Sequence, residues 1–110
     1  MDIITVDFET YYSKKFSLTK LTTEQYVRSP EFEVIGVAVK VNLKSYLQNN
    51  YEWEKSAVLA HNTMFDGAIL SWLFDIHPKL YLDTLCMARG LHGVESSASL
   101  ENLSKMYGVL

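Results

Sequence analysis

The sequence has few of the residues that stabilise secreted or membrane-spanning proteins. It contains one cysteine, Cys86, among 110 residues, which excludes a disulfide within the chain and favours a reducing compartment. We interpret Cys86 as a small buried residue of a helix. No apolar run approaches the roughly 20 residues that cross a bilayer, and the Met1-Asp2-Ile3 start lacks the basic region of a signal peptide. We therefore expect no membrane contact and a cytoplasmic location.

The chain also lacks an excess of basic residues, because its formal net charge is −3. This charge argues against a protein that binds nucleic acid through a general basic face. It does not exclude an enzyme that holds nucleic acid through bound cations, since the formal charge omits the metal. The length predicts a single domain over residues 1–110.

The hydrophobic pattern predicts strands and helices in alternation along most of the chain. This order indicates an α/β sandwich with a mixed sheet, in which early strands pair antiparallel and later ones are parallel through helical crossovers. The predicted strands cover residues 2–8, 33–41, 57–60 and 79–82, and the predicted helices cover 22–27, 43–51, 64–74, 84–91 and 100–107.

Two carboxylates lie one residue apart on the first predicted strand. Side chains alternate along a strand, so Asp7 and Glu9 share one face, while Ile4, Val6 and Phe8 line the other. Two anions on one face repel each other, and a divalent cation between them removes that repulsion. The pattern indicates a metal site, with an ordinary solvated strand face as the alternative.

A third carboxylate, Asp66, follows the short apolar strand at 57–60. Alone, Asp66 also fits a capping box with Thr63, three residues earlier, and acids are favoured in the first turn of a helix. His61 and Asn62 then read as polar loop residues. We interpret Asp83 as the N-cap of the next helix and leave it out of the metal set.

Three segments together carry a resemblance to a known family. Val-Asp-Phe-Glu-Thr at 6–10, His-Asn-Thr-Met-Phe-Asp at 61–66 and Leu-Asp-Thr-Leu-Cys-Met-Ala-Arg at 82–89 resemble the DEDD (DnaQ-like) 3′–5′ exonuclease family. The resemblance spans nearly the whole chain and is closest to the proofreading exonuclease region of bacteriophage family A DNA polymerases. It implies an RNase H-like mixed sheet with flanking helices. The implied activity is hydrolysis of phosphodiester bonds at single-stranded DNA 3′ ends, in the host cytoplasm if the chain is phage-encoded.

The resemblance also implies roles for individual residues in a site with two divalent cations, Mg²⁺ or Mn²⁺. Asp7 would bridge both ions, Glu9 would complete the ion that holds the attacking water, and Asp66 would reach the second ion. Phe65 has an alternative role as a core residue. The residues implied to position the terminal nucleotide are Phe8, Thr10, His61, Asn62 and Phe65.

The sequence departs from the family pattern in two places. Residues 6–10 match the family's first motif and residues 61–66 match its second motif. The third motif, which supplies the fourth acid as an aspartate preceded four residues earlier by a Tyr or His, is absent, because Tyr107 has no residue at 111 to complete it. After Val41 the chain turns at Asn42 into a predicted helix where relatives have another strand. We therefore expect a fold that is incomplete at the C-terminus, lacks one edge strand and exposes apolar surface.

These departures leave several functions and partners open. The chain is either a metal-dependent exonuclease or a catalytically silent, truncated module that binds nucleic acid or a polymerase. An RNA-trimming exonuclease is a third reading. The expected partners are a single-stranded DNA 3′ end, a polymerase domain or missing C-terminal segment, and a second copy of the chain bound through exposed apolar surface.

Overall fold

The structure is a computed structural model that describes residues 1–41, 52–93 and 97–108. The helix predicted over 43–51 and the expected loss of an edge strand lie outside the described residues. All other predicted elements are present, with ends that agree to within two residues. The strands are β1 (Ile3–Thr10), β2 (Val34–Val41), β3 (Ala57–Ala60) and β4 (Leu80–Asp83), and the helices are α1 (Thr23–Val27), the short 3-10 turn η1 (Trp53–Lys55), α2 (Thr63–Phe74), α3 (Thr84–His92) and α4 (Leu100–Met106).

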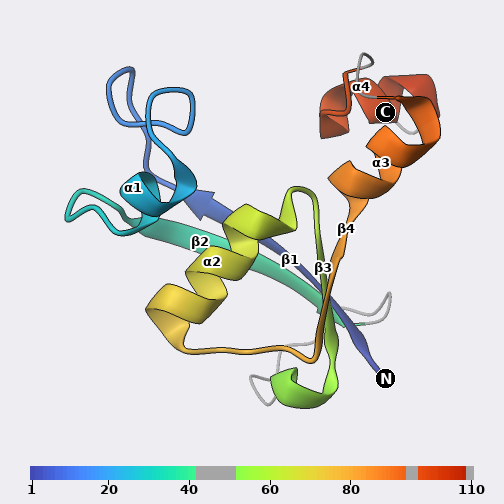
Figure 1. Cartoon of the computed structure of the whole chain (residues 1–110), viewed down its shortest axis with the longest axis horizontal. Helices are drawn as coiled ribbons and strands as arrows, with labels where there is room; N and C mark the ends of the chain where they lie inside the picture. Colours follow the sequence, from blue (N-terminus) through green and yellow to red (C-terminus); the bar gives the residue numbers. More distant parts are fainter. Residues whose placement is uncertain (42–51, 94–96, 109–110) are drawn as a thin grey trace.

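The four strands form one mixed sheet in the order β2-β1-β3-β4 (Figure 1). β1 and β2 pair antiparallel, whereas β1 with β3, and β3 with β4, pair in parallel. The helix α2 makes the crossover between the parallel strands β3 and β4, as such a connection requires. The predicted α/β class and the mixed pairing are therefore confirmed.

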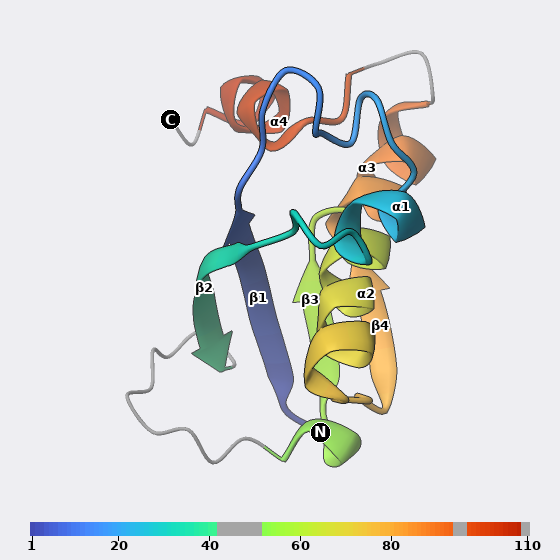
Figure 2. The ribbon, with the colours of Figure 1, turned by 90° about the vertical axis from the view of Figure 1, so that its left-hand side faces the viewer.

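The alternation along β1 separates a covered face of the sheet from an open one. Ile4, Val6 and Phe8 are buried, while Asp7 and Glu9 on the opposite face are exposed. Helices α1 and α2 lie over the face that carries the apolar residues (Figure 2). The predicted division of β1 into an apolar and an acidic face is confirmed.

Local capping defines where three helices begin. Thr22 and Gln25 form a reciprocal capping box at α1, in which each side chain accepts a hydrogen bond from the backbone N–H of the other. Asp83 caps α3 through the N–H of Leu85, and Ser99 caps α4 through Asn102. These caps agree with the starts predicted from the sequence.

Helices α3 and α4 lie beyond the carboxyl end of β4 rather than over the sheet (Figures 1 and 2). Ala88 is the buried residue of α3, and Cys86 on the same helix is exposed. The prediction that Cys86 is buried is therefore wrong. Cys86 is exposed because α3 extends past the sheet, so that most of the helix surface faces solvent.

Apolar side chains are exposed on the strands as well as on α3. Ile35 and Val37 of β2, Leu80 of β4 and Leu91 of α3 all expose a large part of their surface. Such surface is available for contact with another molecule. Among the described residues, no helix is both long enough and apolar enough to span a membrane.

Candidate functional site

The position of Asp66 follows from the length of the parallel pairing beside β1. Pairing of β1 with β3 ends at Thr5 and Leu59, so Phe8 lies three residues past the last pair. The backbone N–H of Phe8 then donates to Oδ1 of Asp66, at 3.1 Å. Because α2 follows directly after β3, its first turn brings the Asp66 carboxylate to the edge of β1 that β3 leaves unpaired.

The capping box considered for Thr63 and Asp66 does not form. Asn62 occupies the N-cap position of α2 with a left-handed backbone (φ 66°), and its side chain makes no capping hydrogen bond. The Asp66 carboxylate is directed to β1 instead. The predicted capping box is therefore wrong, whereas the predicted position of Asp66 in the first turn of α2 is confirmed.

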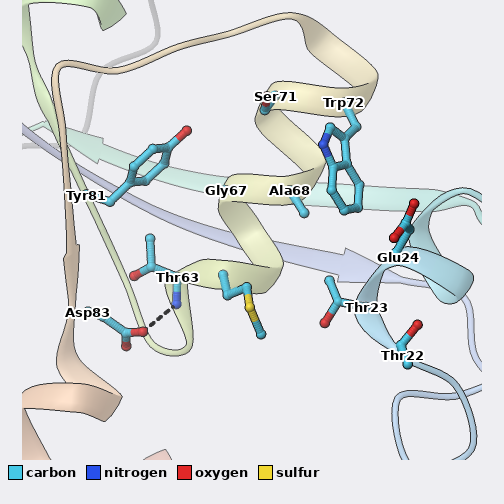
Figure 3. A pocket seen from close by; sticks show the side chains of 11 residues that line it. Thr22, Thr23, Glu24, Thr63, Gly67, Ala68, Ser71, Trp72, Tyr81 and Asp83 are labelled. Atoms are coloured by element: carbon cyan, nitrogen blue, oxygen red, sulfur yellow. Dashed lines mark hydrogen bonds between the residues drawn. The ribbon is translucent and has the colours of Figure 1, made fainter.

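Asp83 supplies the missing cap of α2 from the end of β4. Its Oδ1 accepts the N–H of Asn62 at 2.9 Å. Its Oδ2 accepts the N–H of Thr63 at 3.0 Å (Figure 3). Oδ1 also accepts the N–H of Leu85 at 2.9 Å. One carboxylate thus satisfies the first N–H groups of two helices, α2 and α3.

Burial raises the pKa of Asp66 from 3.8 to about 6. The hydrogen bond from Phe8 lowers this pKa, while the charge of Asp7, and to a smaller extent that of Asp83, raises it further. The effect of Asp7 means that the two carboxylates are close enough to interact electrostatically. Asp66 is therefore a buried acid for which the charged form is unfavourable in this arrangement.

Asp83 responds to its surroundings in the opposite direction. Partial burial raises the pKa of Asp83, but the hydrogen bonds from Thr63, Asn62, Leu85 and Cys86 together outweigh it, so that the pKa lies below 3.8. Its carboxylate is fully used by these donors. This supports the prediction that Asp83 is a cap and leaves it without free oxygen lone pairs directed at a metal ion.

Of the three acids proposed as metal ligands, Asp7 and Asp66 are close enough to interact electrostatically, but the described residues show no compact cluster of all three. Asp7 and Glu9 point to the open face of the sheet, and Asp66 reaches the edge of β1 from α2. Within residues 1–41, 52–93 and 97–108, no group of three or more His, Cys, Asp or Glu side chains is gathered closely enough to hold a metal ion. The donor atoms match Mg²⁺ or Mn²⁺ chemically, but the side chains would have to turn toward one another to share an ion.

Three of the residues expected to position a nucleotide make contacts within the protein. Phe8 is buried, and its ring stacks on that of Phe74 with centroids 6.0 Å apart. The hydroxyl of Thr10 lies 3.0 Å from that of Tyr26, and the ring of Phe65 packs against the same tyrosine at 6.0 Å. The alternative reading of Phe65 as a residue that packs against the core agrees with this contact.

His61 and Asn62 lie in the loop between β3 and α2. The carbonyl oxygen of Ala98 can only accept, so His61 Nε2 donates to it at 2.7 Å, and Nδ1 lies 2.9 Å from the hydroxyl of Thr84. His61 therefore links the segment before α4 to the start of α3. The backbone N–H of Asn62 is bonded to Asp83, and its side chain is half-buried.

A groove of about 800 Å³ runs along the side of α2 that faces away from β1 (Figure 3). Thr22, Thr23, Glu24 and Trp72 line one side of the groove in Figure 3, and Tyr81 and Asp83 line the other. None of Asp7, Glu9 and Asp66 lines this groove. The groove and the acidic residues of β1 and α2 are therefore separate features.

The sequence predicted one role of Asp83 and missed the other. The contact with Leu85 is local and follows from the position of an aspartate before a helix. The contacts with Asn62 and Thr63 join residues about 20 positions apart. No local spacing signals them, because they depend on β3 and β4 ending side by side.

Comparison of the chain with models of protein families, with curated proteins and with solved structures finds no match. The function proposed below therefore depends on the residues of this chain and on the resemblance of its motifs.

Proposed function

We propose that the chain is an RNase H-like 3′–5′ exonuclease domain that hydrolyses phosphodiester bonds with the help of divalent cations. The observation that carries the proposal is the hydrogen bond from the Phe8 N–H to Asp66. It brings an acid of the second motif to the strand that carries Asp7 and Glu9, although the two motifs are far apart in the sequence.

The electrostatics of Asp66 support a cation in this position. A buried carboxylate with a raised pKa, beside a second carboxylate, gains most from a neighbouring positive charge. Aspartate and glutamate oxygens are hard ligands, which Mg²⁺ and Mn²⁺ prefer. Asp7, Glu9 and Asp66 are the residues that would hold the cations.

Bound cations would supply an activated water and stabilise the leaving oxygen of the phosphodiester. The chain's own residues have simpler tasks. The Phe8 N–H fixes the orientation of Asp66, and Asp83 holds the first turn of α2, from which Asp66 projects. Single-stranded DNA 3′ ends are proposed as the substrate on the resemblance of residues 6–10 and 61–66 to proofreading exonucleases.

A second candidate function is a catalytically silent module that binds nucleic acid or a polymerase. In the described part of the chain, the acids are not gathered into a ready ligand cluster, and this observation favours it. The exposed apolar residues Ile35, Val37 and Leu80 would then contribute to a surface for a polymerase domain, a further segment or a second copy.

Digestion of a 5′-labelled single-stranded DNA by the 110-residue chain tests the enzymatic proposal. With Mn²⁺ we expect products that shorten by one nucleotide at a time, and none with EDTA. Asp7→Asn should slow the reaction by about 100-fold or more, because a lost metal ligand costs several kcal/mol of transition-state stabilisation.

Asp75→Asn is the matched control. Asp75 is an exposed acid at the opposite end of α2 with a left-handed backbone, which asparagine tolerates. It should digest at the wild-type rate. A folded wild-type chain that leaves the DNA intact would overturn the enzymatic proposal in favour of the silent module, and an RNA substrate cut faster than DNA would change the substrate class.

A further inference from the structure

Tyr26 lies outside both acidic motifs but contacts the segment that follows Glu9. It belongs to α1, and only 2% of its surface is exposed. Its hydroxyl donates to the carbonyl oxygen of Tyr11, and the hydroxyl of Thr10 lies 3.0 Å away. Since the phenol has a single proton and gives it to Tyr11, the Thr10 hydroxyl must donate to the Tyr26 oxygen.

These two hydrogen bonds hold β1 at the point where its pairing with β2 becomes irregular. Glu9 lies opposite Gly36, whereas Thr10 lies opposite Val34, so that Ile35 is an extra residue in β2. A bulge of this kind bends the strands and changes the direction of nearby side chains. The pairing of β1 with β2 therefore does not by itself fix the direction of the Glu9 side chain. The hydrogen bonds of Tyr26 with Thr10 and Tyr11, the two residues after Glu9, supply this restraint.

The ring of Tyr26 contacts the other half of the candidate site. It packs at 6.0 Å from the ring of Phe65, which directly precedes Asp66 in the first turn of α2. On its other sides it stacks on Phe16 at 4.6 Å and meets the edge of Phe32 at 5.2 Å. The ring is thus held on several sides, and its contact with Phe65 restrains the turn that carries Asp66.

We propose that Tyr26 is a positioning residue for the metal-binding carboxylates, acting on Glu9 through its hydroxyl and on Asp66 through its ring. It touches neither the cations nor the substrate. The inference rests on the proposed function, because it concerns how that function's ligands are oriented. Sites of this kind lose affinity when supporting groups allow their ligands to shift by a fraction of an ångström.

The test compares Tyr26→Phe with Tyr12→Phe in the 110-residue chain. Tyr26→Phe keeps the packed ring and removes both hydrogen bonds of the hydroxyl, while Tyr12 is 76% exposed and serves as the control. The dissociation constant for Mn²⁺ is measured from the electron paramagnetic resonance signal of the free ion, well below the unfolding temperature. Circular dichroism establishes that each variant is folded.

We expect Tyr26→Phe to bind Mn²⁺ about tenfold more weakly, as is typical when a group that supports metal ligands is removed. Tyr12→Phe should bind as the wild type does. A purely structural role would lower the unfolding temperature of Tyr26→Phe and leave the Mn²⁺ dissociation constant unchanged. That result would overturn the inference while leaving the proposed function in place.

If the wild type itself does not bind Mn²⁺, the proposed function fails, and the role of Tyr26 fails with it. If Tyr26→Phe does not fold, Thr10→Val carries the test. This variant removes the hydrogen bond to the Tyr26 oxygen and leaves the bond to Tyr11 intact. It should weaken Mn²⁺ binding about threefold, and an unchanged dissociation constant would overturn the inference.

Discussion

The backbone N–H of Phe8 and the carboxylate of Asp66 form a buried 3.1 Å hydrogen bond between residues 58 positions apart. This bond takes the place of a strand partner at the point where β3 no longer accompanies β1. It provides one favourable interaction for a carboxylate that burial and the charge of Asp7 both disfavour. The hydrogen bond therefore connects β1 to α2, but it does not fully offset the free-energy cost of the charge on Asp66.

Asp66→Asn should stabilise the metal-free protein at neutral pH. Asparagine keeps an oxygen that accepts the Phe8 N–H, and it removes a buried charge. Because the pKa of Asp66 is raised from 3.8 to about 6, the wild type loses stability as the pH rises through this interval. The loss is on the order of 3 kcal/mol in the free energy of unfolding and is complete above about pH 6.

Urea unfolding at pH 4 and pH 7.5 measures this effect. The difference between Asp66→Asn and the wild type should be small at pH 4 and large at pH 7.5. Asp75→Asn, which changes an exposed acid, should follow the wild type at both values. Equal urea midpoints for Asp66→Asn and the wild type at pH 7.5 would contradict the electrostatic cost assigned to Asp66.

Mn²⁺ should raise the unfolding temperature of the wild type at pH 7.5 and do so less at pH 5. The cation competes with the proton for Asp66, whose pKa is about 6. At 100 times the dissociation constant, a ligand that binds only the native state adds about 2.7 kcal/mol. Differential scanning fluorimetry with and without EDTA follows the shift.

The same titration on Asp66→Asn provides the control for the metal effect. This variant should show little or no increase in its unfolding temperature when Mn²⁺ is added. An increase equal to that of the wild type would mean that the cation binds elsewhere on the chain.

Asp83→Ala should destabilise the protein although it is no metal ligand in our proposal. The substitution removes the acceptor of the N–H groups of Asn62, Thr63 and Leu85. Loss of a single helix cap costs about 1 kcal/mol, so two caps should cost on the order of 2 kcal/mol. Circular dichroism during urea unfolding measures the change.

The pH dependence of Asp83 has the opposite sign to that of Asp66. Its pKa is lowered in the folded chain, so its contribution is present above pH 3.8 and is lost as the pH falls through the folded pKa. The difference between Asp83→Ala and the wild type should therefore shrink in strong acid. A difference that grows there would refute the role of the carboxylate as a shared cap.

His61→Ala should loosen α4 without unfolding the sheet. His61 Nε2 donates to Ala98, just before α4, whereas α4 is held to α3 by a separate contact between the rings of His92 and Tyr107. The substitution also removes the contact with Thr84 in α3. Loss of the bond to Ala98, worth about 1 kcal/mol, should increase amide exchange in α4 by roughly five- to tenfold. Hydrogen exchange with mass spectrometry resolves this segment.

His77→Ala is the matched control for His61→Ala. His77 is exposed, and the hydrogen bond given by its side chain goes to the exposed Asp75. Exchange in α4 should be the same in this variant as in the wild type. If His61→Ala also leaves exchange in α4 unchanged, the link between His61 and Ala98 does not anchor that helix.

Much of the fold could be predicted because its signals are local. The alternation of Ile4, Val6 and Phe8 with polar residues identifies β1 and its covered face. Thr22 and Ser99 mark helix starts through contacts with residues three positions away. Cys86 was assigned to the correct helix but to the wrong environment, because its burial depends on where α3 lies relative to the sheet.

The sequence proposes members for the candidate site but does not predict the contacts that connect them. The sequence identified Asp7, Glu9 and Asp66, and nothing in it indicated that Asp66 would receive the N–H of Phe8. It also gave Thr10 a role toward a nucleotide, whereas its hydroxyl contacts Tyr26. Such contacts depend on how far each strand extends beside its neighbour. The pattern of residues along the sequence does not predict that length.

By itself, the sequence determined the kinds of element and the face of β1 that carries Asp7 and Glu9, because side-chain periodicity and charge are properties of neighbouring residues. Tertiary structure alone decided that Asp83 also caps α2 and that α3 lies beyond the end of the sheet. It also decided that Asp66 becomes a buried acid with a raised pKa. Burial and long-range hydrogen bonds arise only when distant segments pack together. They determine the free-energy difference between the charged and neutral forms of each acid.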